Sequence, residues 1–313
     1  KKDELKIDIN ELINDDKYGL SLEEEDKKYI LENYKKWDNP IFIIYDISQS
    51  NSEHCRHHFF NGELYLNGQK IEKSLFDLVK EPLHNSYTNN VSLIAFNDNS
   101  SAIKGYENKI LKLNDKYEYE LKKNNLHFVL TAETHNFPTA ISPFSGAATG
   151  IGGRIRDVQA TGKGAIPIAS SAGYCVGDLF NKLNYPSNIS KPIDIIIQAS
   201  NGASDYGNKF GEPIVNGFTR SFQGIFNHKR IEWIKPIMFT AGLGVIYNSN
   251  ITKQTPKKGY VLCKIGGPVY KIGLGGSTAS SRVSDDKNAK LDFSAVQRAD
   301  PQMEQKMNKV IRS

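Results

Sequence analysis

The 313 residues, of which 39% are hydrophobic, are enough for two or more domains with ordinary cores. The net charge is +5, and residues 1–40 contain 8 Lys/Arg against 12 Asp/Glu. The sequence has no dense basic stripe, so we do not expect a nucleic-acid partner. Three widely spaced cysteines argue against a disulfide framework and no apolar run reaches the ~18–20 residues that span a bilayer, so we expect a cytoplasmic protein without a membrane partner.

The first forty residues predict an acidic helical linker. Residues 21–37 form a capped amphipathic pattern, in which Ser21 and Glu24 match a capping box. Ile30, Tyr34 and Trp37 then recur on one helical face. Pro40 is expected to end this helix.

Four apolar segments predict strands in the domain that follows, which we place at residues 41–255. They are residues 41–45, 91–96, 126–132 and 193–199. In residues 126–132 the apolar side chains alternate, so Glu133 and His135 should emerge just past the strand end. Pro138 bars regular strand pairing beyond that point.

A second domain is expected to begin near residue 256 and to be truncated at residue 313. Residues 260–265 predict its first strand. Its last helix should begin with Asp300 as N-cap and Pro301 at the first helical position, and its apolar face would contain Met303, Met307 and Val310. The abrupt start and end of the sequence lead us to expect a piece of a longer chain.

A first polar cluster, Glu53-His54-Cys55-Arg56-His57-His58, follows residue 50. A zinc site is disfavoured because the ligands are consecutive and no second Cys/His pair stands at a metal-ligand interval. A histidine beside a carboxylate and an arginine suits an acid/base group or a phosphate contact. A purely structural role remains open.

A second polar cluster, Glu133-Thr134-His135-Asn136, follows the alternating strand. A carboxylate at a strand end can give Mg²⁺ a hard oxygen ligand, and the turn would bring an imidazole and an amide to the same substrate. The alternative is a solvated loop carboxylate.

A glycine-rich stretch at residues 146–153 is neither a P-loop nor a dinucleotide fingerprint. Its small residues predict a loop whose backbone N–H groups reach anionic oxygens, with a helix N-terminus just after it. Arg154 and Arg156 could add forked hydrogen bonds to phosphate.

Taken together, these motifs resemble the phosphoribosylformylglycinamidine synthases, in their large single-chain form, of the aminoimidazole ribonucleotide synthetase superfamily. The resemblance covers essentially the whole chain in order. It rests on residues 50–57, 74–76, 99–102, 133–139, 146–164, 201–208, 266–281 and 292–307. It implies an α+β fold, with a synthetase N-terminal-like domain preceded by the helical linker and followed by the start of a C-terminal-like domain.

The resemblance also implies a reaction. An enzyme of this family converts formylglycinamide ribonucleotide to the amidine with ATP and Mg²⁺, through an iminophosphate. The ammonia would come from glutamine, in a glutaminase domain of the same longer chain. The family resemblance leaves an alternative, in which this half is a scaffold that holds a structural nucleotide. Another superfamily member, such as a selenophosphate synthetase or a thiamine-phosphate kinase, is a further alternative.

Residue by residue, the resemblance implies the following roles. His54 matches an active-site histidine and His135 a proton acceptor, while Glu133 and Asp157 match magnesium ligands. The matches to substrate contacts are Thr134, His135, Asn136, Phe137, Arg156 and Gln297. The matches to nucleotide contacts are His57, Gly146, Ala147, Ala148, Thr149, Gly150, Ile151, Gly152, Gly153, Arg154, Ile155, Arg156 and Asp157.

Three positions depart from the shorter bacterial pattern. Phe137 stands where many members have a second histidine, so no chemistry is assigned to it. Thr131 replaces a lysine that contacts ATP, and His57 replaces a tyrosine of the same nucleotide site. The ATP contacts of this chain therefore stay open.

Overall fold

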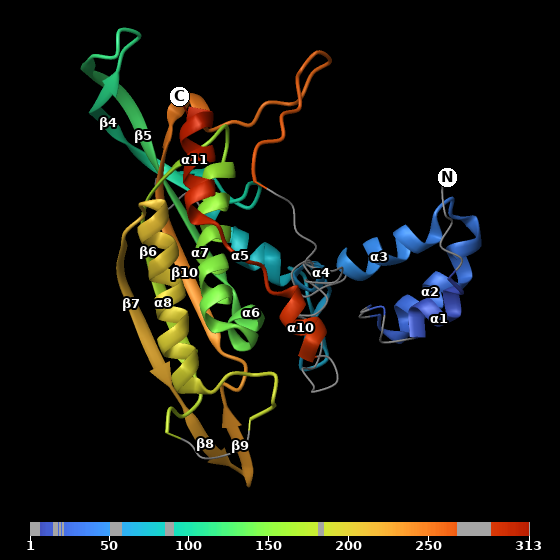
Figure 1. Cartoon of the computed structure of the whole chain (residues 1–313). Coiled ribbons are helices and arrows are strands. Elements are labelled where there is room, and N and C mark those ends of the chain that lie inside the picture. Colours follow the sequence, from blue (N-terminus) through green and yellow to red (C-terminus); the bar gives the residue numbers. More distant parts are fainter. Residues whose placement is uncertain are drawn as a thin grey trace. The chain divides into compact units, whose positions relative to one another are not determined.

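The computed structural model describes residues 7–14, 18, 20, 22–50, 58–84, 91–180, 185–267 and 289–312 (Figure 1). The chain divides into two compact units. The first comprises residues 1–88, 186–188 and 271–296, and the second comprises residues 89–185, 189–270 and 297–313. These units do not coincide with the expected domain boundaries after residues 40 and 255, which remain predictions. Helices and strands are mixed, and the predicted α+β class is confirmed.

The first unit begins with a small helical core. It contains α1 (Ile9–Asn14), α2 (Glu24–Asn33), the 3₁₀ helix η2 (Tyr34–Lys36) and α3 (Pro40–Ser50). Leu12, Ile30 and Ile44 are buried together. The helix predicted within residues 21–37 is confirmed, but its capping box is formed by Glu23 and Asp26 instead of Ser21 and Glu24.

The strand predicted at residues 41–45 is wrong, because this segment lies in α3. Pro40 occupies the first helical position, where its missing N–H costs nothing. Ile44 and Ser48, four residues apart, are buried, whereas Phe42 is exposed. Short apolar runs of this kind fit a helix face as well as a strand.

The rest of the first unit consists of short elements. They are α4 (His58–Asn61), the antiparallel hairpin of β1 (Leu64–Leu66) and β2 (Gln69–Ile71), α5 (Leu75–His84) and α10 (Ala289–Ala295). Just before α5, the Asp77 N–H donates to Ser74 Oγ, and Asp77 Oδ2 accepts from the Ser74 N–H. This reciprocal capping explains where α5 begins.

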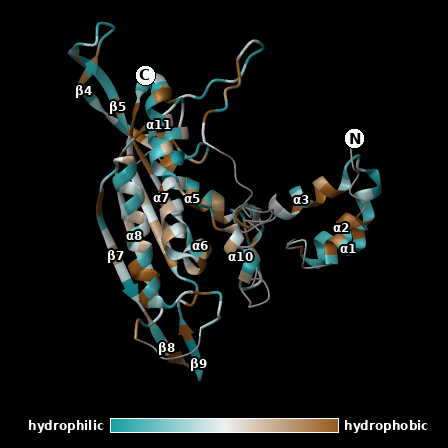
Figure 2. Ribbon diagram, viewed as in Figure 1, coloured by the Kyte–Doolittle hydropathy of each residue, from teal (hydrophilic) through white to brown (hydrophobic). Residues whose placement is uncertain are grey.

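The second unit is built on a six-stranded sheet. In spatial order its strands are β3 (Ser92–Ile94), β4 (Ser101–Leu113), β5 (Tyr119–Thr134), β10 (Ile237–Tyr247), β6 (Ile166–Val176) and β7 (Ile214–Ser221). All neighbours are antiparallel except β6 and β7, which are parallel. The outer part of the β4–β5 hairpin is largely hydrophilic (Figure 2). A separate hairpin joins β8 (Gln223–Phe226) and β9 (Lys229–Glu232).

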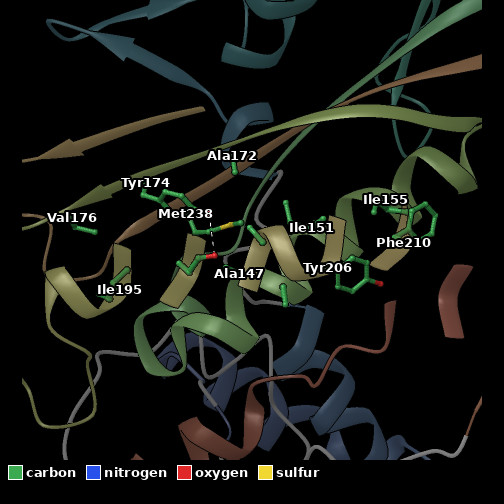
Figure 3. Close-up of a cluster of buried hydrophobic side chains, with 13 residues drawn as sticks. Ala147, Ile151, Ile155, Ala172, Tyr174, Val176, Ile195, Tyr206, Phe210 and Met238 are labelled. Atoms are coloured by element: carbon green, nitrogen blue, oxygen red, sulfur yellow. Dashed lines mark hydrogen bonds between the residues drawn. The ribbon is translucent and has the colours of Figure 1, made fainter. Parts of the chain in front are cut away.

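Helices cover one face of this sheet. They are α7 (Pro143–Ala160) and α8 (Pro192–Phe210), which lie side by side, with the short α6 (Asn136–Ile141) before α7 and α11 (Pro301–Arg312) against α8 (Figure 1). A 3₁₀ turn, η4 (Asn248–Asn250), follows β10. Figure 3 shows the core between the helices and the sheet, where Ile151 of α7, Tyr174 of β6, Ile195 of α8 and Met238 of β10 meet.

The strand predicted at residues 193–199 is also wrong, because this segment is the first half of α8. Pro192 again stands at the first helical position. Ile195, Ala199 and Ala203 are buried at intervals of four, which is the helical period. The strands predicted at residues 91–96 and 126–132 are confirmed as β3 and as part of β5.

The strand predicted at residues 260–265 is wrong, and the helix predicted after Asp300 is confirmed only in part. Residues 260–265 form no strand, and Leu262 is 98% exposed, because no strand of the described residues pairs with this segment. The N-cap of α11 is confirmed, since the Met303 N–H donates to Asp300 Oδ1 at 3.0 Å. Its predicted apolar face is wrong, because Val310 is exposed and Glu304 is buried.

Candidate functional site

A cavity of about 290 Å³ lies in the second unit, between the end of β5 and one face of α7. Three segments of the chain converge on it, residues 133–135, residues 149–157 and residue 297. The lining residues are Glu133, Thr134, His135, Thr149, Gly150, Gly153, Arg154, Arg156, Asp157 and Gln297. All ten are among the residues predicted from the sequence, so the fold brings these predicted residues together.

The stretch predicted to be a glycine-rich loop is helical. Residues 146–157 lie within α7, so most of their N–H groups bond within the helix and cannot cradle a phosphate. The helix instead presents two faces. Residues 149, 150, 153, 154, 156 and 157 line the cavity, while Ala147, Ala148, Ile151 and Ile155 pack into the core.

Although this stretch is not a phosphate loop, two of its glycines are required by close packing. A Cβ added to Gly150 would lie 2.9 Å from Cβ of His135. A Cβ added to Gly152 would lie 2.6 Å from Cζ and Oη of Tyr206. Both positions therefore need glycine for close packing against a neighbouring side chain, and one of those neighbours lines the cavity.

His135 is fixed at the junction between β5 and α6. Its backbone N–H donates to the Met238 carbonyl oxygen at 2.9 Å. Its ring Nδ1 lies 2.5 Å from the Gly146 carbonyl oxygen. Because a carbonyl only accepts, Nδ1 carries the proton in the neutral ring, and Nε2 is then the unprotonated, basic nitrogen.

Glu133 and Asp157 form a pair of carboxyl groups at this cavity. Partial burial, together with the charge of Asp157 and a hydrogen bond to it, raises the pKa of Glu133. Two adjacent carboxyl groups are a donor set that Mg²⁺ uses when substrate phosphates supply the other ligands. The two residues therefore fit the predicted metal, although the described ranges contain no group of three acidic, His or Cys side chains that could hold one.

Asn99 of the β3–β4 connection supports Asp157, and Lys253, which follows β10, supports Asn99. Nδ2 of Asn99 donates to Asp157 Oδ1 at 3.3 Å, and Nζ of Lys253 donates to Asn99 Oδ1 at 3.1 Å. Neither residue is predicted from the sequence to have a role at the site. Asn99 belongs to one of the motifs that carry the family resemblance, which is the signal that could have singled it out.

The two arginines of α7 differ in what they can bind. Arg154 is fully buried, and its two terminal nitrogens donate to the Glu212 carboxylate, while Nε donates to Thr240 Oγ1 at 3.3 Å. The expectation that Arg154 forks onto a phosphate is therefore not supported by its geometry. The side chain of Arg156 is 49% exposed and bonds to Glu304 at 3.4 Å. Arg156 is thus the arginine positioned for an anionic ligand.

Several predicted site residues lie elsewhere. Asn136 caps a neighbouring strand, since its Oδ1 accepts from the Met238 N–H at 3.0 Å, and Phe137 is buried. Gly146 and Gly152 lie on α7 but do not line the cavity.

Gln297, by contrast, lines the cavity, and its carbonyl oxygen accepts from Thr149 Oγ1 at 3.3 Å. His54 and His57 lie outside the described residues.

Comparisons with known proteins agree with the resemblance seen in the sequence. The family model described as AIR synthase related protein, N-terminal domain, matches residues 114–246. The chain is 48% identical over 94% of its length to the phosphoribosylformylglycinamidine synthases of Dictyostelium discoideum and Homo sapiens, of which it covers 23%. The chain thus spans about a quarter of the length of these curated relatives.

Solved structures give a weaker likeness. A structure titled T. maritima PurL complexed with FGAR shares 27% identity with a TM-score of 0.41, over 59% of this chain and 26% of that one. The PurL structure titled as complexed with ATP shares 32% identity with a TM-score of 0.29, over 40% of this chain and 17% of that one. Within the part of this chain that the structure describes, no helix is both long and apolar enough to cross a bilayer.

Proposed function

We propose, on the premise that this chain is related along 94% of its length to the phosphoribosylformylglycinamidine synthases, that its cavity is part of the synthetase site of such an enzyme. The reaction would be an ATP-dependent ligation in purine biosynthesis. It converts formylglycinamide ribonucleotide and ammonia to the amidine, and ATP to ADP and phosphate. The observation that carries the proposal is the convergence of ten predicted site residues on one cavity.

The proposed chemistry has two steps. The amide oxygen of the substrate first attacks the γ-phosphoryl group of ATP, so that an O–P bond forms, the bond to ADP breaks and the amide nitrogen releases its proton to solvent, leaving a C=N bond. Ammonia then attacks the amide carbon of this iminophosphate, forming a C–N bond while the C–O bond to phosphate breaks. Since the protein adds no covalent chemistry, positioning and charge neutralisation supply most of the acceleration.

In this scheme His135 accepts a proton. The nitrogen of ammonia must lose a proton as the C–N bond forms, and a neutral imidazole is a suitable acceptor near pH 7. The bond from Nδ1 to the Gly146 carbonyl oxygen makes Nε2 the accepting nitrogen and fixes the plane of the ring. The packing of Gly150 against His135 keeps the ring at the cavity wall.

The other residues would bind and orient. Glu133 and Asp157 would hold Mg²⁺, which neutralises charge on the ATP phosphates when it is bound. Arg156, which is half-exposed at the cavity, would bind an anionic group of formylglycinamide ribonucleotide. A supply of ammonia from a glutaminase domain in the same longer chain, and a cytoplasmic location, complete the proposal.

The test is ADP release by the full-length protein with formylglycinamide ribonucleotide, Mg²⁺ and an ammonium salt. We expect His135→Ala to lower kcat by at least about a hundredfold, the usual contribution of a positioned acid or base. The matched control is His228→Asn, which changes a histidine in the β8–β9 turn with φ +62°, a conformation that asparagine tolerates. Near-normal turnover of His135→Ala would overturn the catalytic role and favour a scaffold that holds a structural nucleotide.

A further inference from the structure

A buried carboxyl group stands behind the candidate site. Glu304 is the second buried residue of α11 and is only 8% exposed. Its Oε2 accepts a hydrogen bond from the hydroxyl of Tyr206 on α8 and from Nη1 of Arg156 on α7, the latter at 3.4 Å. Three helices therefore meet at one carboxyl oxygen.

The surroundings of Glu304 suit a fixed, buried anchor. Burial raises the pKa of Tyr206, so its hydroxyl remains a hydrogen-bond donor at all physiological pH values. The other carboxyl oxygen, Oε1, is buried and has no hydrogen-bond partner among the described residues. A buried carboxyl group that is only half satisfied is costly, which is a reason to look for a role of Glu304 beyond helix packing.

Arg156 is the group that needs an anchor. Its side chain lines the small cavity and also a larger cavity of about 1220 Å³ that lies beside the β4–β5 hairpin and the end of α11. Without a fixed partner, a long and half-exposed guanidinium would divide its time between the two cavities. The bond to Glu304 restricts that choice, because Glu304 is held in turn by Tyr206.

We infer that Glu304 is a positioning residue that holds the guanidinium of Arg156 at the small cavity, where Arg156 binds an anionic group of the substrate. The inference rests on the proposed function and extends it to α11 and α8, which contribute no side chain to the lining of the small cavity. Glu304 itself does not touch the substrate. Its loss should therefore weaken substrate binding more than it slows turnover.

The experiment measures steady-state ADP release by the full-length protein at varied formylglycinamide ribonucleotide. Glu304→Gln keeps the shape of the side chain but removes the charge that holds Arg156. We expect KM for this substrate to rise about tenfold, which is the scale of one hydrogen bond between charged groups, while kcat and KM for ATP change less than about twofold. Tyr206→Phe, which frees Glu304 but leaves its charge, should raise the same KM by a smaller factor, about threefold.

A matched control separates positioning from packing. Gln305, the next residue of α11, donates from Nε2 to the Phe210 carbonyl oxygen and so also anchors α11 to α8. Gln305→Ala should leave KM unchanged. In addition, Glu304→Gln should have little further effect in an Arg156→Lys background, since both changes remove the same interaction.

The outcomes separate the inference from the proposed function. If Arg156→Lys raises KM and Glu304→Gln does not, the inference is wrong and the proposed function stands. If neither Arg156→Lys nor Glu304→Gln changes KM, the substrate contact of the proposed function is wrong as well. If Glu304→Gln does not fold, the KM of Tyr206→Phe decides, and a wild-type value overturns the inference.

Discussion

Each of three buried carboxyl groups of the second unit has a cationic partner. Glu212 pairs with Arg154, Glu304 with Arg156, and Asp98 with Lys253. A buried charge without a partner would cost several kcal/mol, roughly 3–5 when one member of a pair is removed. Single residues at these positions therefore govern both stability and the geometry of the site.

Asp98 shows how such a group depends on pH. Burial removes solvent from this carboxyl group, but the hydrogen bonds from Nζ of Lys253 and from the N–H groups of Gly162 and Asn99 outweigh that cost and hold its pKa below the usual 3.8. A lowered pKa means that the folded state prefers the carboxylate. The resulting stability is present above the unfolded pKa and is lost as the pH falls through the folded pKa.

We predict that Asp98→Asn lowers the melting temperature of the full-length protein at pH 7, because Lys253 and the Gly162 N–H lose a charged partner. The difference from wild type should shrink as the pH falls from about 4 through the lowered pKa of the folded state, since the carboxyl group is protonated first in the unfolded chain and only at lower pH in the folded one. The matched control is Asp115→Asn in the exposed β4–β5 turn, which should change little. A difference that stays constant from pH 7 to pH 3 would contradict this account.

At the scale of elements, α7 organises the second unit. One face of this helix supplies Ile151 and Ile155 to the core, and another supplies Asp157 to the cavity. Its glycines at positions 150 and 152 admit His135 of the β5–α6 junction and Tyr206 of α8. The helix thus couples the packing of α8 to the shape of the cavity.

Two adjacent glycines of α7 allow a matched test of this role. Gly152→Ala would drive a methyl group into the ring of Tyr206, so we expect the opening free energy of α7 to fall by about 1–3 kcal/mol. At Gly153 the nearest atom to an added Cβ is Nη2 of Arg156 at 3.6 Å, so Gly153→Ala should raise the same quantity by up to about 1 kcal/mol through helix propensity.

Hydrogen exchange of the α7 amides in the full-length protein measures both effects. Because Tyr206 anchors Glu304, Gly152→Ala should also raise KM for formylglycinamide ribonucleotide. Equal effects of the two alanine substitutions would show that the contact with Tyr206 does not constrain the helix.

At the scale of the whole molecule, the chain corresponds to about a quarter of its curated relatives. We expect the 313-residue chain alone to release no ADP with formylglycinamide ribonucleotide, Mg²⁺ and ammonium, and to be poorly soluble. The exposed apolar side chains of residues 261 and 262 indicate a surface that needs a partner. The control is the full-length protein in the same assay. Turnover by the short chain, or a monodisperse monomer that melts cooperatively, would contradict this prediction.

Local sequence patterns determined much of this protein. The alternation in residues 126–132 located β5 and therefore the position of Glu133 and His135 at its end. Asp300 and Pro301 marked the start of α11 because a cap acts on backbone groups only a few residues away. The motifs that carry the resemblance included every residue that lines the small cavity. This is possible because the chemistry of a site requires particular residue types, which the sequence shows directly.

Only the tertiary structure decided which side chains face each other and which short apolar runs are helical. Residues 41–45 and 193–199 fit either a strand or a helix until their burial is known. Arg154 and Arg156 look alike in the sequence, yet their partners lie 58 and 148 residues away, at Glu212 and Glu304. The function of a charged or glycine residue depends on such distant neighbours, since burial and pairing arise only when the chain is folded.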